Sequence, residues 1–193
     1  MGKGLLIVMS GPSGVGKGTI LELLRAHYEP ERKVFLSVSA TTRGMRPGEI
    51  DGYHYHFIDR EHFVELRDRG ELLEYAEYAG NMYGTPASPI DSHIANGDIV
   101  VLDIETRGAF QVMEKRDDAV SVFIMPPDMD ELERRLRGRG TETEEQIQRR
   151  MAISRSECGH AEKYDYIIYN DTLDNAVEAF CKIIDTNLNG DVK

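Results

Sequence analysis

A glycine-rich segment near the N-terminus constrains the fold of this chain more than any other feature. Residues 11–19 read GPSGVGKGT and come just after the apolar run Leu5–Met9. Ile20, Leu21 and Leu24 then recur at helical spacing. A buried strand, a glycine loop and a helix in this order predict a phosphate-binding loop, because the N–H groups of the loop and of the helix start converge on phosphate oxygens. The alternative is an ordinary glycine turn.

The loop fits the P-loop pattern G-x-x-x-x-G-K at Gly11, Gly16 and Lys17. Lys17 is in place to reach the β- and γ-phosphates of a nucleotide. Gly18 departs from the pattern, because a Mg²⁺-binding Ser or Thr usually stands there, and Thr19 points elsewhere on a helix. We therefore expect nucleotide oxygens, water and a carboxylate to hold Mg²⁺. The ATP-binding residues predicted in the loop are Gly11, Ser13, Gly14, Val15, Gly16, Lys17, Gly18 and Thr19.

Asp103 is the candidate for that carboxylate. It ends the apolar run Ile99–Leu102, which predicts another buried strand. Ligands of open α/β sheets bind outside the carboxyl ends of the strands. This position favours a role at the metal, directly or through water, or at the phosphate acceptor. A helix N-cap or a solvated strand end is the alternative.

The rest of the chain alternates strands with helices. Strands are expected at 34–39, 99–102, 120–125 and 165–170, and helices near 90–97, 128–137, 143–163 and 173–188, two of which begin at sequences typical of capping boxes. This order predicts an α/β fold with a doubly wound parallel sheet. Residues 40–85 are polar and rich in Arg, Gly and Tyr, and they predict an inserted lobe with small strands and a helix near Glu61–Arg69.

The composition narrows the choice of partners. The formal net charge is -11, which argues against a broad surface for nucleic acid or anionic membranes. No run approaches the roughly 18 apolar residues of a membrane span. Cys158 and Cys181 have no metal-binding spacing, and reduced thiols are the expected state. The expectation is a soluble, cytoplasmic protein.

Two arginines in the inserted lobe suggest where the phosphate goes. Arg43 and Arg46 stand three residues apart in a loop, and Tyr55 and Tyr83 add hydroxyl donors. Arginine forks suit phosphate, and tyrosine hydroxyls can complete such a site. A solvated basic loop is the alternative reading of the charge pattern.

Six segments taken together resemble the guanylate kinase family, the P-loop nucleoside monophosphate kinases that act on GMP. They read GPSGVGKGT, SVSATTRGMRPGEIDGYHYHF, LLEYAEYAGNMYGTP, VVLDIETRGAFQV, RLRGRGTETEEQIQRRM and YDYIIYND, and they span nearly the whole chain. The resemblance implies the reaction ATP + GMP ⇌ ADP + GDP with Mg²⁺. It also implies one domain, residues 1–193, with a P-loop kinase core (1–33, 86–133 and 164–193), a GMP-binding insert (34–85) and a helical lid (134–163).

The resemblance also implies roles for individual residues. The GMP-binding residues would be Ser39, Arg43, Arg46, Tyr55, Glu74, Tyr83, Thr85, Asp103 and Glu105. Guanine presents N1–H and an exocyclic amine as adjacent donors, which one carboxylate can accept; adenine lacks this pair. The alternation in residues 73–78 does not choose between Glu74 and Glu77, and the family motif selects Glu74. Glu105 departs from the family's usual Asp, which weakens its assignment.

A cluster of arginines flanks residues 138–141 and predicts a lid over ATP. The resemblance places Arg135, Arg139 and Arg150 at the transferring phosphates and Asn170 near adenine, and the catalytic set becomes Lys17, Arg43, Arg135, Arg139 and Arg150. A solvated face of ion pairs is the alternative. The acceptor is a phosphate with a second pKa of about 6, so no general base is required. The positive groups must neutralise charge and align the two nucleotides.

Three other functions remain open at this point. A related fold could phosphorylate a sugar phosphate, although Glu74 favours a base pocket. A non-catalytic module could hold phosphopeptides with the insert, but Gly16, Lys17 and the lid arginines argue against it. The net charge argues against a nucleic-acid binder. A monomer or a small homo-oligomer is expected.

Overall fold

The computed structural model describes residues 3–29, 31–78, 80–138 and 143–190. In chain order the elements are β1 (Leu5–Ser10), α1 (Lys17–Tyr28), β2 (Val34–Leu36), β3 (Ala40–Thr41), β4 (His56–Phe57), α2 (Arg60–Asp68), β5 (Leu72–Tyr78), β6 (Asn81–Pro86), α3 (Ala87–Ala95), β7 (Ile99–Asp103), α4 (Thr106–Lys115), β8 (Ala119–Met125), α5 (Met129–Gly138), α6 (Glu144–Cys158), a 3₁₀ turn (Ala161–Lys163), β9 (Tyr166–Tyr169) and α7 (Leu173–Asn189).

The larger sheet has five strands in the order β2-β7-β1-β8-β9, and every described pairing is parallel. Its central strand, β1, is buried along its whole length, as expected for a parallel strand with helices on both faces. The doubly wound α/β fold is confirmed. Within it Met9 lies opposite Asp103 of β7, so the carboxyl ends of β1 and β7 meet at one edge of the sheet.

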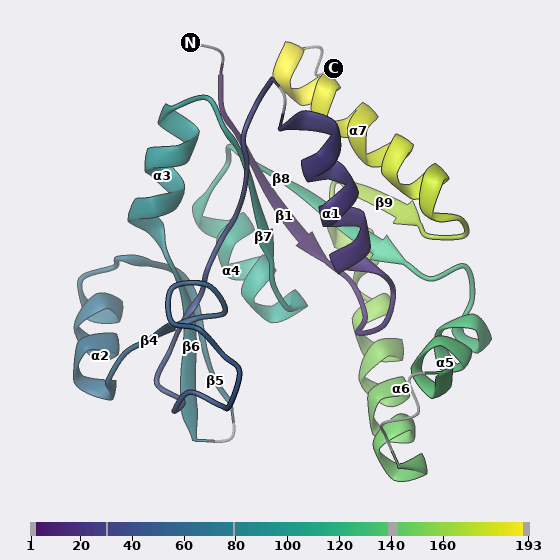
Figure 1. The fold of residues 1–193 in the computed structure, drawn as a ribbon, viewed down its shortest axis with the longest axis horizontal. Coiled ribbons are helices and arrows are strands. Elements are labelled where there is room, and N and C mark those ends of the chain that lie inside the picture. The colour runs from purple at the N-terminus through teal and green to yellow at the C-terminus, as the bar shows by residue number, and fades with distance from the viewer. Residues whose placement is uncertain (1–2, 30, 79, 139–142, 191–193) are drawn as a thin grey trace.

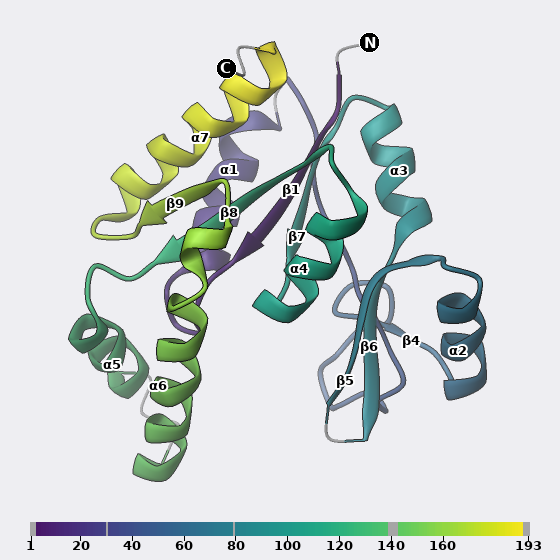
Figure 2. The same cartoon turned by 180° about the vertical axis from the view of Figure 1, so that it is seen from behind.

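Side chains of β1 alternate between two apolar clusters. Ile7 packs on the face covered by α1 and α7, with Leu24 and Phe180. Val8 packs on the opposite face, where α3 and α4 lie and Val112 is buried. Figures 1 and 2 show these two pairs of helices on the two faces of the sheet. The glycine loop therefore leaves β1 between two well-packed layers.

The second sheet has four strands in the order β4-β3-β6-β5, with α2 beside it. Its apolar cluster contains only four buried residues, which are Ala40, Phe63, Leu72 and Met82. Residues 34–36, with which the expected insert begins, form β2 and pair with β7 in the larger sheet. The expected strand 34–39 is too long, because the chain leaves the larger sheet after Leu36 and enters the second at Ala40.

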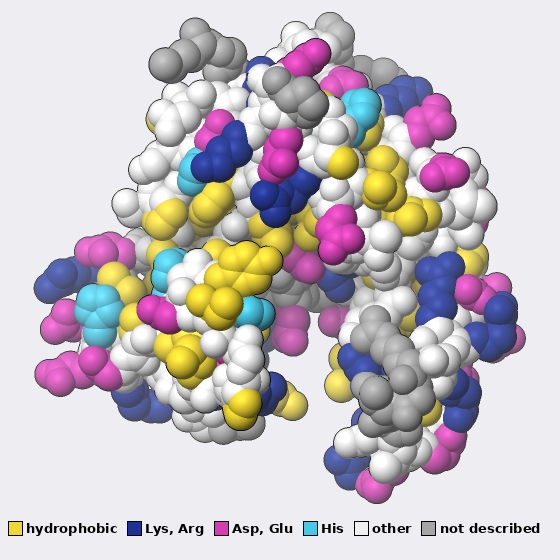
Figure 3. All heavy atoms as spheres, viewed as in Figure 1, with side chains coloured by type: hydrophobic (Ala, Val, Ile, Leu, Met, Phe, Trp, Pro, Cys, Tyr) yellow, Lys and Arg dark blue, Asp and Glu magenta, His cyan; other side chains and the backbone are white. Residues whose placement is uncertain are grey.

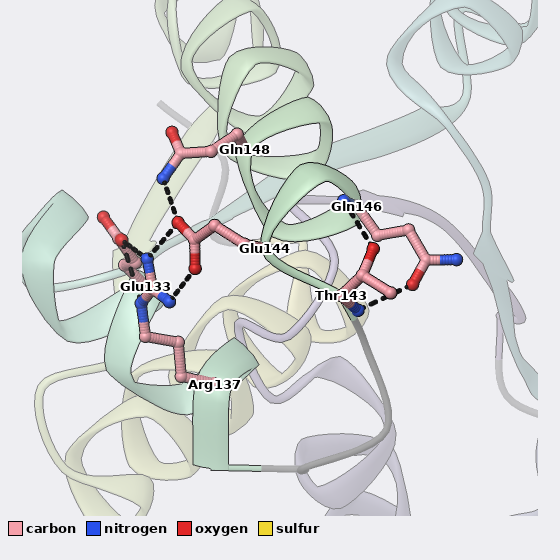
Figure 4. Close-up of polar contacts among 6 residues, drawn as sticks. All are labelled: Glu133, Arg137, Thr143, Glu144, Gln146 and Gln148. Carbon is pink, nitrogen blue, oxygen red and sulfur yellow. Dashed lines mark hydrogen bonds and ion pairs between the residues drawn. The ribbon is translucent and has the colours of Figure 1, made fainter.

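Helices α5 and α6 lie opposite the second sheet (Figure 1), and their Leu132, Leu136, Ile147 and Met151 are buried in the core cluster of the larger sheet. Thr143 begins α6 with a capping box, as predicted, and its hydroxyl accepts from the Gln146 N–H (Figure 4). Arg137 pairs with Glu133 within α5 and joins α5 to α6 through an ion pair with Glu144. The expected extension of this helix to residue 163 is wrong, because the helix ends at Cys158 and a 3₁₀ turn follows.

Candidate active site

The glycine loop has the backbone that its sequence predicts. Gly16 caps α1 with a φ of 105°, in the left-handed region that favours glycine. A Cβ at this position would lie 2.6 Å from Asn170 Nδ2. The Asn170 amide donates to the Val15 carbonyl at 2.7 Å. Asn170 thus faces the loop and supports it with one of its two side-chain N–H donors.

Lys17 and Asp103 meet where β1 and β7 end. Lys17 Nζ donates to the Gly11 carbonyl at 2.6 Å and lies 3.8 Å from Asp103 Oδ1. Loss of solvation raises the pKa of Asp103, and the nearby Lys17 charge lowers it in part. The first N–H groups of α1 have no acceptor within their helix. Together these groups form the phosphate side of the cleft.

The residues around Gly18 fit a magnesium ion that arrives with a nucleotide. A Cβ at Gly18 would meet no atom within 4 Å, and Thr19 is exposed beside it. Asp103 supplies a carboxylate with a third of its side chain exposed. Among the described residues no group of three or more His, Cys, Asp and Glu could hold a metal by itself. Such a site suits Mg²⁺, which binds through one or two carboxylates, water and substrate phosphates.

Two of the three predicted lid arginines contact the loop from α5 and α6. Arg135 donates to the Val15 carbonyl at 3.4 Å and to the Asn170 carbonyl at 3.3 Å. Arg150 donates to Ser13 Oγ at 2.5 Å. Both guanidinium groups therefore lie beside the phosphate side. Arg139 is outside the described residues.

Arg43 is held by an acid that sequence reasoning missed. Its Nη1 and Nη2 donate to the two carboxylate oxygens of Glu49, at 2.9 and 2.7 Å. The ion pair and the Arg46 backbone N–H lower the pKa of Glu49 to about 2. The Arg43 guanidinium lies 5.5 Å from the Tyr55 ring centre, which is 6.0 Å from that of Tyr83. Three predicted phosphate residues thus form one group, while the Arg46 side chain is exposed.

Glu74 is a buried carboxylate on the second sheet, with a relative exposure of 7%. Thr85, its neighbour on β6, donates to Glu74 Oε1 at 2.6 Å. Ser39 Oγ lies 3.4 Å from Thr85 Oγ1. Burial raises the pKa of Glu74, whereas the Thr85 hydrogen bond and the charge of Lys115 lower it. We call this group the base side of the cleft.

Glu105 occupies the N-cap position of α4 and makes no side-chain capping bond, and its charge contributes to raising the pKa of Glu74. It lines a hollow of about 420 Å³ with Thr106, Phe110 and Glu157. Sequence reasoning missed Glu157. The spacing along α6 could have indicated it, because Glu157 lies seven residues after Arg150 and therefore on the same face of the helix.

The two sides of the site lie on different parts of the molecule. Figure 3 shows the surface hollowed between the lobe of the second sheet and the helices α5 and α6. The glycine loop, Lys17 at the start of α1 and Asp103 at the end of β7 lie at the edge of the larger sheet. Glu74, Arg43 and Tyr83 belong to the second sheet and its loops.

In the described part of the chain, the helices lack the length and apolar character that a membrane span requires.

Comparisons with known proteins decide the family. The family model described as guanylate kinase matches residues 3–187. The chain belongs to the guanylate kinase family. It is 48% identical over 184 residues to the guanylate kinase of Vibrio cholerae serotype O1, covering 95% of this chain and 88% of that one. It is 47% identical over 182 residues to that of Halalkalibacterium halodurans, covering 94% and 88%.

A solved guanylate kinase shares the fold. The crystal structure of the enzyme from Anaplasma phagocytophilum superposes with a TM-score of 0.71 at 35% identity, over 97% of this chain and 87% of that one. The resemblance drawn from six short segments is therefore confirmed over almost the full length. A guanylate kinase needs one cleft that brings together phosphate groups and one base, and this chain has a candidate residue set for each.

Proposed function

We propose that this cleft carries out the guanylate kinase reaction, ATP + GMP ⇌ ADP + GDP, with Glu74 selecting the base and Lys17 at the transferred phosphoryl group. The observation that carries this assignment is a buried, oriented carboxylate on the second sheet, opposite a phosphate loop that has a lysine. A buried carboxylate without a partner is costly, so a ligand with two adjacent donors is favoured over one without them.

On the base side, ionised Glu74 accepts the N1–H and the amine of guanine. Thr85 has one hydroxyl proton, which it donates to Glu74. We therefore assign Thr85 to orienting the carboxylate, and Ser39, within 3.4 Å of Thr85, to the guanine carbonyl oxygen. Adenine offers an acceptor at N1 and would face the carboxylate with like charge density.

On the phosphate side, the protein supplies positive charge rather than a proton acceptor. The GMP phosphate is largely ionised at neutral pH. Among the described contacts, Arg43 uses the end of its guanidinium for Glu49, which leaves the edge carrying Nε for a phosphate oxygen. Lys17, Arg135 and Arg150 bind the phosphates of ATP and hold them in line with the acceptor.

Magnesium would enter this site with ATP, held by Asp103 and by phosphate oxygens and water. Bound there, the ion neutralises charge on the phosphates. Closure of the second-sheet lobe and of α5 and α6 over the hollow would exclude water, which otherwise accepts the phosphoryl group. We place the reaction in the cytoplasm, in a monomer or small homo-oligomer.

A nucleotide panel tests this function. The enzyme is mixed with ATP, Mg²⁺ and one of GMP, AMP, CMP or UMP, and the products are separated and quantified. GDP and ADP should form in equal amounts, and the other acceptors should react far more slowly. Preference for ribose phosphate over GMP would favour a sugar-phosphate kinase. Failure to bind ATP would favour a phosphopeptide-binding module.

A further inference from the structure

We propose that α4 fixes the position of the base-selecting carboxylate from the core side, through a contact face formed by Gly108, Gln111 and Lys115. The inference rests on the proposed role of Glu74 and goes beyond it. It assigns a role in base specificity to three residues that belong to neither the ATP phosphate site nor the GMP phosphate site. They would act on the base only through Glu74, so they are positioning residues.

Gly108 gives the carboxylate its space. A Cβ built on Gly108 would lie 2.8 Å from Glu74 Oε2 and 3.2 Å from Glu74 Cδ. Real Cβ atoms do not approach an oxygen so closely, so any other residue would displace the carboxylate or the helix. Gly108 lies inside α4, where alanine favours the helix more than glycine does. The glycine is therefore explained by Glu74 and not by the helix.

Gln111 and Lys115 hold the backbone on both sides of Glu74. The Gln111 amide accepts from the Tyr75 N–H at 3.2 Å and donates to the Tyr75 carbonyl at 3.0 Å. Lys115 Nζ donates to the Leu73 carbonyl at 2.8 Å. The residues before and after Glu74 are thus tied to one helix. The register of β5 with β6 shifts between Leu72 and Glu74, so regular alternation does not by itself set the direction of Glu74. The ties to Leu73 and Tyr75 hold this irregular stretch of backbone on both sides of Glu74.

The contact face is separate from the face that packs α4 onto the larger sheet. Positions 108, 111 and 115 follow helical spacing along one side of α4. Ala109 and Val112, which lie between them in sequence, are fully buried in the core cluster. α4 therefore carries two functions on two faces, one anchored in the core and one directed at β5 (Figure 2). The positive charge of Lys115 also acts on Glu74 and favours its ionised form.

The test uses Gly108→Ala and compares GMP with inosine monophosphate, which keeps N1–H and lacks the exocyclic amine. The displaced carboxylate should lose one hydrogen bond to guanine, so kcat/KM for GMP should fall about 10- to 100-fold. Most of the fall should appear in the KM for GMP, and the preference for GMP over inosine monophosphate should shrink. The KM for ATP should not change.

Glu114→Ala is the control, because Glu114 lies on the same helix, α4, with an exposed side chain. This variant should keep the wild-type KM for GMP and the wild-type base preference. An equal loss in both variants would overturn the proposal, because it would show that the effect does not come from the collision with Glu74.

A double-mutant cycle separates positioning from general damage. In a Glu74→Ala background, Gly108→Ala should have little further effect on kcat/KM for GMP, because the group on which it acts has gone. A full additional loss in that background would contradict the proposal. If Gly108→Ala does not fold, Gln111→Leu is used in the same cycle, with the same two outcomes.

These outcomes differ from a failure of the proposed function. If the wild-type enzyme shows no preference for GMP in the nucleotide panel, the role of Glu74 itself is wrong. If the wild type prefers GMP and Gly108→Ala keeps both its KM and its base preference, only the positioning role of α4 is wrong.

Discussion

The charged groups on the phosphate side of the cleft remain in reach of water, whereas the charged group on the base side is buried. Lys17 and Asp103 keep 18% and 33% of their side chains exposed. Glu74 keeps 7% of its residue surface exposed and is fixed by Thr85. The phosphate side uses backbone N–H groups of the glycine loop and long cationic side chains of α1, α5 and α6, and the second-sheet lobe adds Arg43. The base side uses short, neighbouring contacts of the second sheet and α4.

This difference predicts that the phosphate side governs the rate of phosphoryl transfer, whereas the base side governs which nucleotide is accepted. Positive charge held beside the phosphates suits groups that change their bonds during the reaction, because donors already in place stabilise the developing charge without reorganising. A buried acceptor suits recognition, because a ligand that leaves it without a hydrogen bond binds with a less favourable free energy. The two sides should therefore respond differently to substitution, and the following experiments use that expectation.

Lys17→Ala should have the largest effect, which should fall on turnover and ATP binding and not on the choice of base. Removing the charge beside the transferred phosphoryl group should lower kcat by about 10³-fold. The second sheet does not depend on Lys17, so GMP should still bind with unchanged preference over AMP. Steady-state kinetics and calorimetry measure the two quantities. Lys182→Ala, on α7, is the control; near-normal turnover in Lys17→Ala would show that the loop is assigned wrongly.

Phe63→Ala and Phe123→Ala should separate the two regions in stability. Both side chains are fully buried, one in the small cluster of the second sheet and one in the core. Each truncation should cost about 3–5 kcal/mol. Hydrogen exchange should rise only in α2, β3, β5 and β6 for Phe63→Ala, with ATP affinity kept, and throughout the chain for Phe123→Ala. Uniform exchange in both variants would contradict independent stabilities.

The pH dependence of base binding should be a smaller effect with a definite sign. Burial raises the pKa of Glu74 above its ordinary 4.5, and guanine requires the ionised carboxylate. Where free Glu74 is partly protonated, binding should therefore release a proton, and affinity should increase as pH rises through the raised pKa. Guanosine, which has no phosphate to titrate, is measured by calorimetry in two buffers. Equal proton release in Glu74→Gln would show that another group titrates.

The sequence predicted the parts of the site that depend on local pattern. The apolar run of β1 and the spacing of Gly11, Gly16 and Lys17 define a loop whose geometry follows from those few residues. Base selection depends on contacts between distant segments. Alternation in β5 could not choose between Glu74, which is buried, and Glu77, which is exposed, because either face of an isolated strand can carry the acid.

Helix α4 was missed for a related reason. Gly108 lowers helix propensity, and its purpose is visible only when β5 is placed beside it. Glu49 was likewise read as part of a polar loop, since its partner Arg43 was assigned to phosphate alone. Both residues act by positioning another residue, and such roles leave no periodic signal in a sequence.

The most direct test of the account is the ratio of kcat/KM for GMP to that for AMP in Glu74→Gln. The amide offers one acceptor and one donor in place of two acceptors, so it no longer matches guanine. The ratio should fall about 100-fold relative to the wild type, with kcat for ATP consumption at saturating GMP much less affected. An unchanged ratio would show that Glu74 does not select the base. It would contradict the account in which the phosphate side governs the rate of transfer and the base side governs nucleotide selection.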